Sequence, residues 1–246
     1  MTNYILTVKC PTRVGLVAAI ANFLAERQCN ITDASQFDDT ERERFFARLT
    51  FQAPEQMSLE QLKAEVEGLA VMYQMQVGIY PEGEKMKSVI MVSRFGHCLN
   101  DLLYRSSIGA LPIEVVGVIS NHMDYQKLVA NHDIGFHCIK VTNENKKEAE
   151  ARQMAVIEDA GAELVILARY MQILSDQMCQ TMSGRIINIH HSFLPSFKGA
   201  NPYKQAYARG VKLIGATSHY VTAVLDEGPI IEQETVRVTH RHTNTH

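Results

Sequence analysis

The sequence predicts an α/β protein of two domains, and three observations lead to this prediction. Residues 1–80 alternate strand-type and helix-type apolar patterns in the order β-α-β-β-α-β, a ferredoxin-like arrangement. Residues 88–246 contain continuous apolar strands separated by helical segments, which is typical of a doubly wound, mostly parallel sheet covered on both faces. A length of 246 residues also exceeds the usual size of one domain.

Composition excludes several classes of protein. The formal net charge is −3 and no basic block is present, so we expect no nucleic-acid partner. The five cysteines are scattered without C-x-x-C spacing, so we expect neither a disulfide framework nor a metal site. The sequence lacks a signal-peptide pattern and an apolar run of about 20 residues. These features predict a cytoplasmic protein without a membrane partner.

Apolar periodicity sets the expected elements of the first domain. Alternating apolar residues predict strands, and apolar residues three or four apart predict amphipathic helices. Ser58 and Gln61 have the spacing of a capping box, so a helix should begin at residue 59. From this periodicity we expect helices at 16–24 and 59–69 and strands at 4–8, from 30 onward, at 45–51 and at 71–79.

The start of this domain resembles the ACT domain family of small regulatory modules. The resemblance rests on C-P-T-R-V-G-L-V-A-A-I-A-N-F-L at 10–24 and N-I at 30–31. In that family the first turn and the start of the first helix help to form an amino-acid effector site, commonly between domains. The alternative is that Gly15 only turns the chain and the domain serves dimerisation, and both interpretations favour a homo-oligomer. The resemblance implies effector-binding residues Thr12, Arg13, Val14, Gly15, Leu16, Asn30 and Ile31.

A polar, turn-rich segment at 81–87 is the expected linker to the second domain at 88–246. A doubly wound sheet of this kind binds ligands beyond the carboxyl ends of its strands. Its elements should include helices around 99–103 and from 146 to Gly161, and strands at 89–92, 113–119, 136–141, 163–168 and 185–187.

The most informative run is I-I-N-I-H-H-S-F-L-P-S-F at 186–197. Asn188 and His190 follow an apolar strand, and two residues apart on an extended backbone their side chains point the same way. The Asn188 amide can donate to a developing oxyanion, and His190 can transfer a proton near neutral pH. Asp226 is by itself a turn former, but it could orient or charge-stabilise His190 if its loop folds back over the strand edge. This arrangement suits chemistry on a carbonyl group.

The second domain resembles the folate-dependent formyltransferase family. The matching runs, in the family's order, are R-Y-M-Q-I-L at 169–174, N-I-H-H-S-F-L-P at 188–195, G-A-T-S-H-Y-V at 215–221 and L-D-E-G-P-I-I at 225–231. The resemblance implies that Asn188, His190 and Asp226 are the catalytic trio and that no metal or cofactor is required. It also implies a folate pocket lined by Tyr170, Met171, Gln172, Ile173, Leu174, Thr222, Ala223, Val224 and Leu225.

The combination of both domains, with H-C-L-N-D-L at 97–102, is similar to the formyltetrahydrofolate deformylase family. This implies hydrolysis of 10-formyltetrahydrofolate to formate and tetrahydrofolate, with formate supplied to one-carbon and purine metabolism. One alternative is a formyltransferase with an amine acceptor such as glycinamide ribonucleotide. However, His191 stands where that transferase typically has proline, and the S-R-F-G-H loop at 93–97 lacks its phosphate-binding glycines and serines. The other alternative is a catalytically idle regulatory protein that binds folate or an amino acid.

Members of this family continue beyond the region that matches 239–243 with a helical segment and a terminal strand. Because this chain stops at His246, we expect its second domain to lack that closing segment. Uncovering a few hundred Å² of apolar surface would cost several kcal/mol at about 25 cal/mol per Å², unless an oligomer interface covers it.

Overall fold

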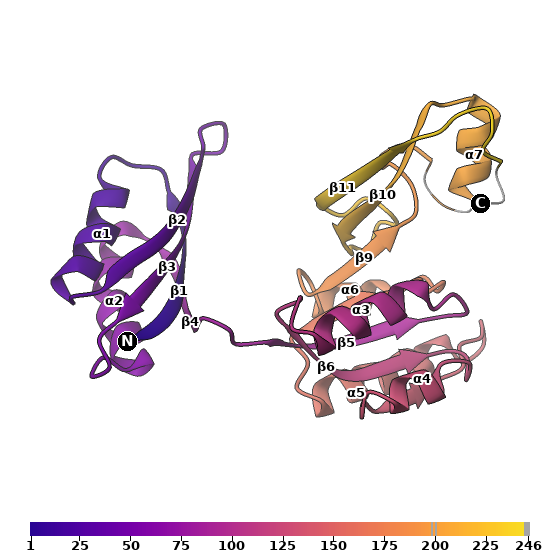
Figure 1. The fold of residues 1–246 in the computed structure, drawn as a ribbon, viewed down its shortest axis with the longest axis horizontal. Helices are drawn as coiled ribbons and strands as arrows, with labels where there is room; N and C mark the ends of the chain where they lie inside the picture. The colour runs from indigo at the N-terminus through magenta and orange to yellow at the C-terminus, as the bar shows by residue number, and fades with distance from the viewer. Residues whose placement is uncertain (198, 200, 244–246) are drawn as a thin grey trace. The chain divides into compact units, whose positions relative to one another are not determined.

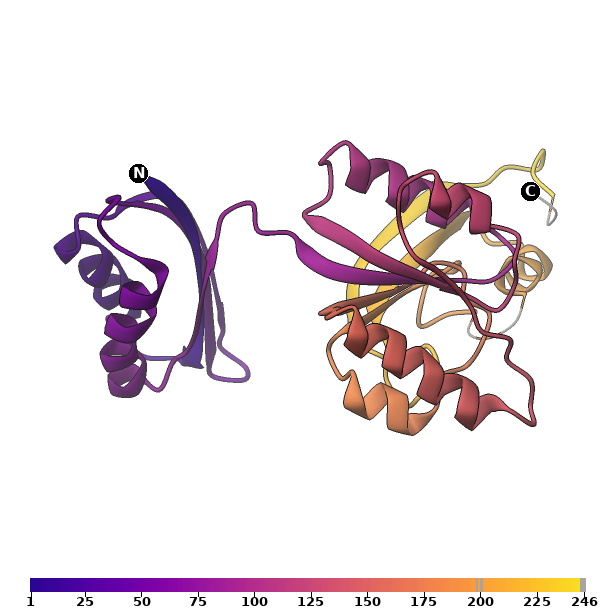
Figure 2. The same ribbon diagram turned by 90° about the horizontal axis from the view of Figure 1, so that it is seen from below.

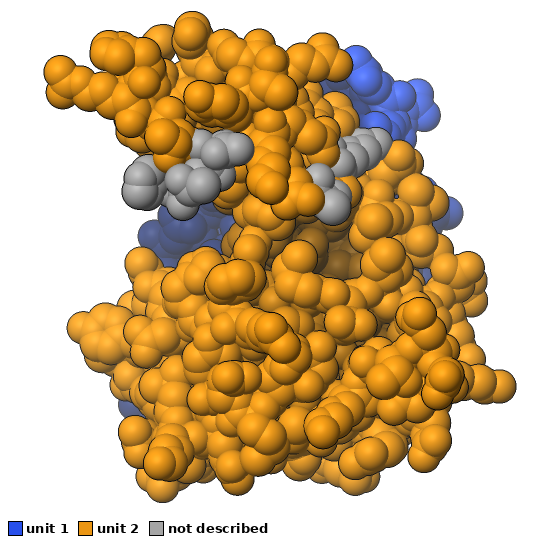
Figure 3. All heavy atoms as spheres, turned by 90° about the vertical axis from the view of Figure 1, so that its right-hand side faces the viewer, with its two compact units in different colours: residues 1–84 blue, residues 85–246 orange. Residues whose placement is uncertain are grey.

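The computed structural model of the protein describes residues 1–197, 199 and 201–243. The chain divides into two compact units, Met1–Glu84 and Lys85–His246, which Figure 3 colours separately. Within the described ranges, no helix is long and apolar enough to cross a membrane.

Unit 1 is a four-stranded antiparallel sheet with both of its helices on one face (Figures 1 and 2). The strand order is β2-β3-β1-β4. Buried apolar side chains such as Leu6, Leu24 and Phe51 fill the space between the sheet and the helices. The elements follow the predicted β-α-β-β-α-β order: β1 (Thr2–Pro11), α1 (Leu16–Glu26), β2 (Asn30–Asp39), β3 (Arg44–Ala53), α2 (Leu59–Tyr73) and β4 (Gln76–Pro81).

The capping box at the start of α2 is confirmed. The Gln61 backbone N–H donates to Ser58 Oγ at 3.2 Å, and the Ser58 N–H donates to Gln61 Oε1 at 2.9 Å. The strand expected over 71–79 is wrong in its first part, because α2 continues to Tyr73. Gln74 then adopts a left-handed conformation with φ 54, which ends the helix before the chain extends into β4.

Unit 2 is built on a seven-stranded sheet in the order β11-β10-β9-β8-β5-β6-β7. The strands from β9 to β7 are parallel, whereas β10 is antiparallel to both of its neighbours, so the predicted mostly parallel sheet is confirmed. Its elements are β5 (Met86–Val92), α3 (His97–Ser107), β6 (Ile113–Ser120), α4 (Gln126–Ala130), β7 (Phe136–Cys138), α5 (Lys146–Asp159), β8 (Leu164–Leu167), α6 (Asp176–Thr181), β9 (Ile186–His190), α7 (Pro202–Arg209), β10 (Leu213–Tyr220) and β11 (Ile230–Arg237).

The segment between the last strand of unit 1 and the first strand of unit 2 is shorter than the expected linker. Pro81 ends β4, and Met86 and Lys87 already belong to β5. Met86 and Lys87 pair with Ile113 and Glu114 of β6. The segment between the two strands therefore consists of residues 82–85.

Helices cover both faces of the parallel part of the sheet, and β5 illustrates the reason (Figure 2). Val89 and Met91 belong to the core cluster that includes α5 and α6, whereas Ile90 and Val92 belong to the cluster that includes α3 and α4. Successive residues of a strand point to opposite faces, so a strand covered on both sides requires a continuous apolar run.

From β5 the chain adds β6 and then β7 toward one edge of the sheet. The strand order then reverses, because the next strand, β8, pairs with the opposite side of β5. In sheets of this kind, the carboxyl ends of the strands on either side of such a reversal border a crevice that binds ligands. The Ser93 N–H, after β5, donates to the Arg169 carbonyl, after β8, at 3.2 Å. The segment that follows β8 is thereby fixed at this edge.

Candidate active site

Asn188 and His190 lie within β9, rather than after a strand that ends at residue 187 as expected. β9 continues through His190 because it pairs on both sides: Leu167 of β8 is opposite Asn188, and Thr217 of β10 is opposite His190. The two side chains share one face of the strand, as their spacing predicted. His190 is buried and Asn188 is partly buried.

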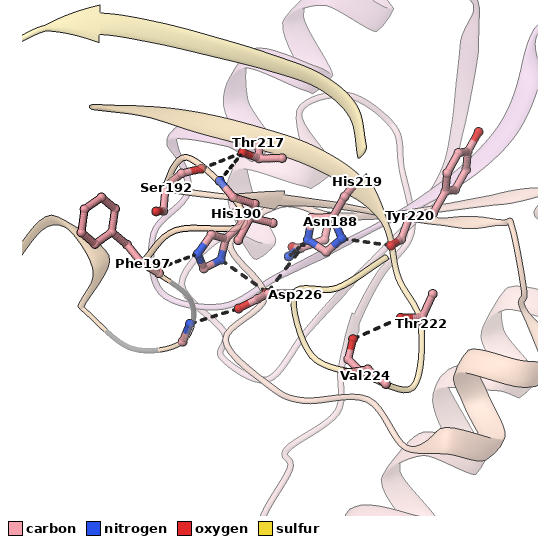
Figure 4. Close-up of polar contacts among 12 residues, drawn as sticks. Asn188, His190, Ser192, Phe197, Thr217, His219, Tyr220, Thr222, Val224 and Asp226 are labelled. Atoms are coloured by element: carbon pink, nitrogen blue, oxygen red, sulfur yellow. Dashed lines mark hydrogen bonds and ion pairs between the residues drawn. The ribbon is translucent and has the colours of Figure 1, made fainter. Parts of the chain in front are cut away.

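Asp226 reaches His190 from the loop between β10 and β11 (Figure 4). Its Oδ1 lies 3.4 Å from His190 Nδ1, and both side chains are less than a tenth exposed. The Gly199 N–H donates to Asp226 Oδ2 at 3.2 Å, so both carboxylate oxygens have partners. On the other side of the ring, His190 Nε2 lies 3.4 Å from the Phe197 carbonyl oxygen. The loop therefore does fold back over the strand edge.

The Asp226 loop packs closely against the end of β10. Asp226 itself has a left-handed backbone with φ 56. A Cβ atom on Gly228 would lie only 1.7 Å from the Tyr220 carbonyl oxygen, so this close approach requires glycine. The turn that sequence reasoning assigned to Asp226 thus also fixes the direction of its carboxylate.

His219 is a buried member of the same group that sequence reasoning missed. Its Nε2 lies 3.3 Å from Asn188 Nδ2 and 3.9 Å from Asp226 Oδ1, and its Nδ1 lies 2.9 Å from the Tyr220 carbonyl oxygen. The signal was present in T-S-H at 217–219, which has the same two-residue spacing as N-I-H at 188–190. Only the register of β9 against β10 shows that the two pairs face each other.

His191 lies beside the site in a different electrostatic setting. Its ring centroid is 5.5 Å from that of His190 and 5.6 Å from that of Tyr203. Burial lowers the pKa of His191 to about 4, and the nearby positive charge of Arg169 acts in the same direction. His191 is therefore a neutral imidazole near neutral pH and acts neither as a cation nor as a counter-ion for Asp226.

A cavity of ≈ 300 Å³ opens beside Asn188, His190 and Asp226, which all line it. The surface of unit 2 is also hollowed on the face that Figure 3 shows. The cavity volume of ≈ 300 Å³ falls at the lower end of the range for small-molecule sites, about 300–1,000 Å³. All nine residues expected to bind substrate line this cavity: Tyr170, Met171, Gln172, Ile173, Leu174, Thr222, Ala223, Val224 and Leu225.

The core of unit 2 anchors the cavity wall after β8. The buried Gln153 side chain donates to the Tyr170 hydroxyl at 2.8 Å, and burial raises the pKa of Tyr170 to about 12. The Met171 N–H donates to Ser93 Oγ at 3.0 Å. Tyr170 thus holds the segment in place as a neutral phenol, while Met171 and Ile173 remain exposed at the cavity.

The turn after β1 holds five of the seven residues expected to bind an effector. Thr12 Oγ1 donates to Asp38 Oδ1 at 2.5 Å, and the Arg13 guanidinium reaches the end of α2. Gly15 has φ 93 immediately before α1, which explains the glycine. The side chain of Leu16 is buried in the core of unit 1, so only its backbone at the start of α1 faces the turn.

Asn30 and Ile31, the other two, lie away from this turn. Asn30 pairs with Gln52 at one end of β2, whereas Asp39 at its other end pairs with Arg44. Arg44 also pairs with the last residue of β1, next to the turn. The ten residues of β2 therefore separate the two groups, and one copy of unit 1 does not unite the predicted effector residues.

The sheet and the site define a protein of the formyl-transfer class, and comparisons with known proteins specify it further. Residues 86–246 match the family described as Formyl transferase, and residues 4–67 match the ACT domain. The chain is 49% identical over 243 residues to a formyltetrahydrofolate deformylase of Corynebacterium sp. (strain P-1), covering 98% of this chain and 84% of the relative. The chain belongs to the formyltetrahydrofolate deformylase family.

Solved structures give the same relationship. The crystal structure of a formyltetrahydrofolate deformylase from Burkholderia mallei is similar with a TM-score of 0.93 and 46% identity, covering 100% of this chain and 87% of that one. A glycinamide ribonucleotide transformylase from Symbiobacterium toebii has a TM-score of 0.62 and 31% identity, covering 68% and 80%. The transferase-type match extends over about two thirds of the chain, whereas the deformylase match extends over all of it.

Proposed function

We propose that the protein hydrolyses 10-formyltetrahydrofolate to formate and tetrahydrofolate. The observation that carries this proposal is the convergence of Asn188, His190 and Asp226 on one cavity that the nine predicted folate-contacting residues also line. Two of the relatives cited above are named formyltetrahydrofolate deformylases, a name that states a formyltetrahydrofolate substrate and removal of its formyl group, and this supports the proposal. The expected role is the supply of formate to one-carbon and purine metabolism in the cytoplasm.

The mechanism follows from what each group can donate or accept. The formyl group on N10 would lie beside β9, with its oxygen toward the Asn188 amide. The His190–Asp226 pair removes a proton from water as the water oxygen attacks the formyl carbon. Asn188 and protonated His190 then stabilise the oxyanion by hydrogen bonds. Asp226 Oδ1 lies 3.4 Å from Nδ1 of His190, on the side of the ring opposite Nε2, so the carboxylate can stabilise the imidazolium that forms when Nε2 accepts the proton from water.

Collapse of the tetrahedral intermediate breaks the bond between the formyl carbon and N10. His190 returns its proton to N10, which gives tetrahydrofolate and formic acid, and the formic acid loses its proton to solvent as formate. General acid–base catalysis contributes about 10²–10⁴-fold, and electrostatic stabilisation of the oxyanion adds to it. We propose that these protein groups suffice and that the reaction uses no metal or organic cofactor.

One assay tests the proposed reaction. The protein is incubated with 10-formyltetrahydrofolate without an amine, and formate and tetrahydrofolate are measured together, with Asn188→Ala as the control for catalysis at this site. We expect both products in equal amounts from the wild type. Turnover that begins only after glycinamide ribonucleotide is added would instead show an amine-dependent transferase, and no turnover in either condition would show an idle binding protein.

We infer a regulatory role for unit 1, supported by its match to the ACT domain. The turn at Thr12–Gly15 would bind a small amino acid, and a second copy of the chain would supply the groups around Asn30 and Ile31 that one copy holds apart. The protein would then act as a homo-oligomer. Calorimetry with glycine and methionine, combined with light scattering, tests both points, and Arg13→Ala should weaken binding without changing basal turnover.

A further inference from the structure

Each proposed catalytic residue of β9 has a buried polar partner directly across the strand pair on β10. In the antiparallel register, His219 is opposite Asn188 and Thr217 is opposite His190. Residues directly opposite in such a pair lie on the same face, with Cβ atoms about 4.5–5.5 Å apart. Thr217 is fully buried and His219 is 2% exposed, so neither is a surface polar residue.

Thr217 has its hydrogen bonds directed at the turn that follows β9. Its hydroxyl donates to the Ser192 carbonyl at 2.8 Å and accepts from the Leu194 N–H at 3.1 Å. Gln233 Nε2 donates to the same hydroxyl at 3.0 Å. Thr217 therefore fixes the backbone after His190, and His219 is the member of the β10 pair that contacts a proposed catalytic side chain.

The hydrogen bonds of His219 determine where its proton lies. Its Nδ1 is 2.9 Å from the Tyr220 carbonyl oxygen, which can only accept, so Nδ1 carries the hydrogen. Its Nε2 lies 3.3 Å from Asn188 Nδ2, which can only donate, so Nε2 must present a lone pair (Figure 4). The arrangement is thus satisfied by the neutral Nδ1–H tautomer and by neither of the other two protonation states.

We propose that His219 is a positioning residue that orients the Asn188 amide for the oxyanion, and this inference rests on the proposed function. One Asn188 N–H is bonded to His219 Nε2, which fixes which end of the amide is the NH₂ group. The second N–H is then directed away from His219 and is available to the formyl oxygen. Without this acceptor the amide is free to rotate and present its own oxygen, which would repel the oxyanion.

The Asp226 carboxylate is positioned for His190 rather than for His219. Asp226 Oδ1 lies 3.9 Å from His219 Nε2, beyond hydrogen-bonding distance, and 3.4 Å from His190 Nδ1. A protonated His219 would compete with His190 for this oxygen and would place a donor against the Asn188 donor. The neutral tautomer leaves the carboxylate to His190.

Two substitutions separate orientation from simple packing. His219→Phe keeps a ring and removes the acceptor, whereas His219→Gln keeps an acceptor oxygen. We expect His219→Phe to lower kcat by about 10–100-fold with little change in KM, which is a smaller loss than the about 10²–10³-fold typical of removing an oxyanion donor. His219→Gln should recover part of this loss. His137→Phe, a substitution of an exposed histidine in β7, is the matched control and should leave kcat unchanged.

The decisive comparison is a double-mutant cycle with Asn188→Ala. If His219 acts through Asn188, His219→Phe should cost little further kcat in the Asn188→Ala background. Equal losses in both backgrounds would overturn the proposal, as would equal losses for His219→Phe and His219→Gln. Binding of tetrahydrofolate by each variant shows that the comparison is made on folded protein.

A spectroscopic measurement keeps this inference separate from the proposed function. The imidazole ¹⁵N chemical shifts of His219 in the wild-type protein should report a protonated Nδ1 and an unprotonated Nε2. The opposite tautomer would overturn the positioning role even in an active enzyme. Absence of formate release from a protein with the expected tautomer would overturn the proposed reaction instead.

Discussion

β9 lies between two strands of opposite character, and the contrast explains how this unit combines stability with a reactive site. On one side, β8 is parallel and contributes the buried apolar residues Val165, Ile166 and Leu167. On the other side, β10 is antiparallel and contributes buried Thr217 and His219. The apolar neighbour stabilises the fold by burial, whereas the polar neighbour fixes directions by hydrogen bonds. Substitutions on the two sides should therefore have different consequences.

The largest expected effect is the loss of activity on the polar side. Asn188→Ala should lower kcat by about 10²–10³-fold because it removes an oxyanion donor, with folate affinity little changed. His190→Ala and Asp226→Ala should lower kcat at least as much, since they remove the proposed proton-transfer group and its proposed counter-ion. Steady-state kinetics with 10-formyltetrahydrofolate, together with thermal melts of each variant, check that activity falls without loss of the fold.

The pair His190 and Asp226 also gives a non-additivity test. In the proposed mechanism the two side chains act as one proton-transfer unit, so the double variant should lose little more kcat than the worse single variant. Losses that multiply would show that the 3.4 Å contact between them has no role in a shared step.

On the apolar side, the expected effect is on stability. Ile166→Ala should lower the free energy of unfolding by about 2–5 kcal/mol, because it leaves a cavity in the core on one face of the sheet. The kcat of the protein that remains folded should be nearly unchanged. Ile189→Ala, on β9 with a side chain that is 38% exposed, is the matched control and should destabilise much less. Urea unfolding of both variants measures the difference.

Most of the apolar side could be predicted from the sequence. The runs of β5, β6 and β8 are continuous and apolar, and this local pattern identifies a strand covered on both faces. The same kind of local pattern misled at 71–79, where alternating apolar residues belong partly to the last turn of α2. There, the position at which Gln74 ends the helix decides the boundary, and residue alternation does not reveal it.

The polar side was predicted only in part. The spacing of Asn188 and His190 placed both side chains on one face, and the approach of Asp226 was expected on the condition that its loop folded back. His219 could not be assigned, because its partner is fixed by the register between β9 and β10. The proton on its Nδ1 further depends on the Tyr220 carbonyl, a backbone group without any sequence signal.

A smaller loss of kcat is expected from moving the Asp226 loop, and a glycine substitution within a strand serves as the comparison. Gly228→Ala places a Cβ 1.7 Å from the Tyr220 carbonyl oxygen, so the Asp226 loop must move. Displacement of a catalytic group by about 1 Å can cost up to about 10²-fold, so we expect a loss of about 10–100-fold in kcat. In β6, a Cβ on Gly117 would meet only Val89 Cγ2 at 3.7 Å, an ordinary contact. Gly117→Ala should retain activity, and equal losses in both variants would argue against a specific role for the loop position.

The smallest expected effect is a pH dependence of stability from His191. Its folded pKa of about 4 lies below the ordinary value of 6.5, so between these values the unfolded chain binds more protons than the folded protein. The free energy of unfolding should therefore fall as pH is lowered from about 6.5 to 4. His191→Gln should flatten this dependence relative to the wild type. Parallel slopes in urea-unfolding series at several pH values would show that His191 does not contribute.

The most direct test of the central claim is the origin of the oxygen in the product. The wild-type protein is given 10-formyltetrahydrofolate in H₂¹⁸O without an amine, and the formate is analysed by mass spectrometry, with Asn188→Ala as the comparison. We expect formate with one ¹⁸O atom, formed at the rate at which tetrahydrofolate appears, and a rate about 10²–10³-fold lower in the variant. Formate without ¹⁸O, or equal rates in the two proteins, would contradict hydrolysis by water at the site between β9, β10 and the Asp226 loop.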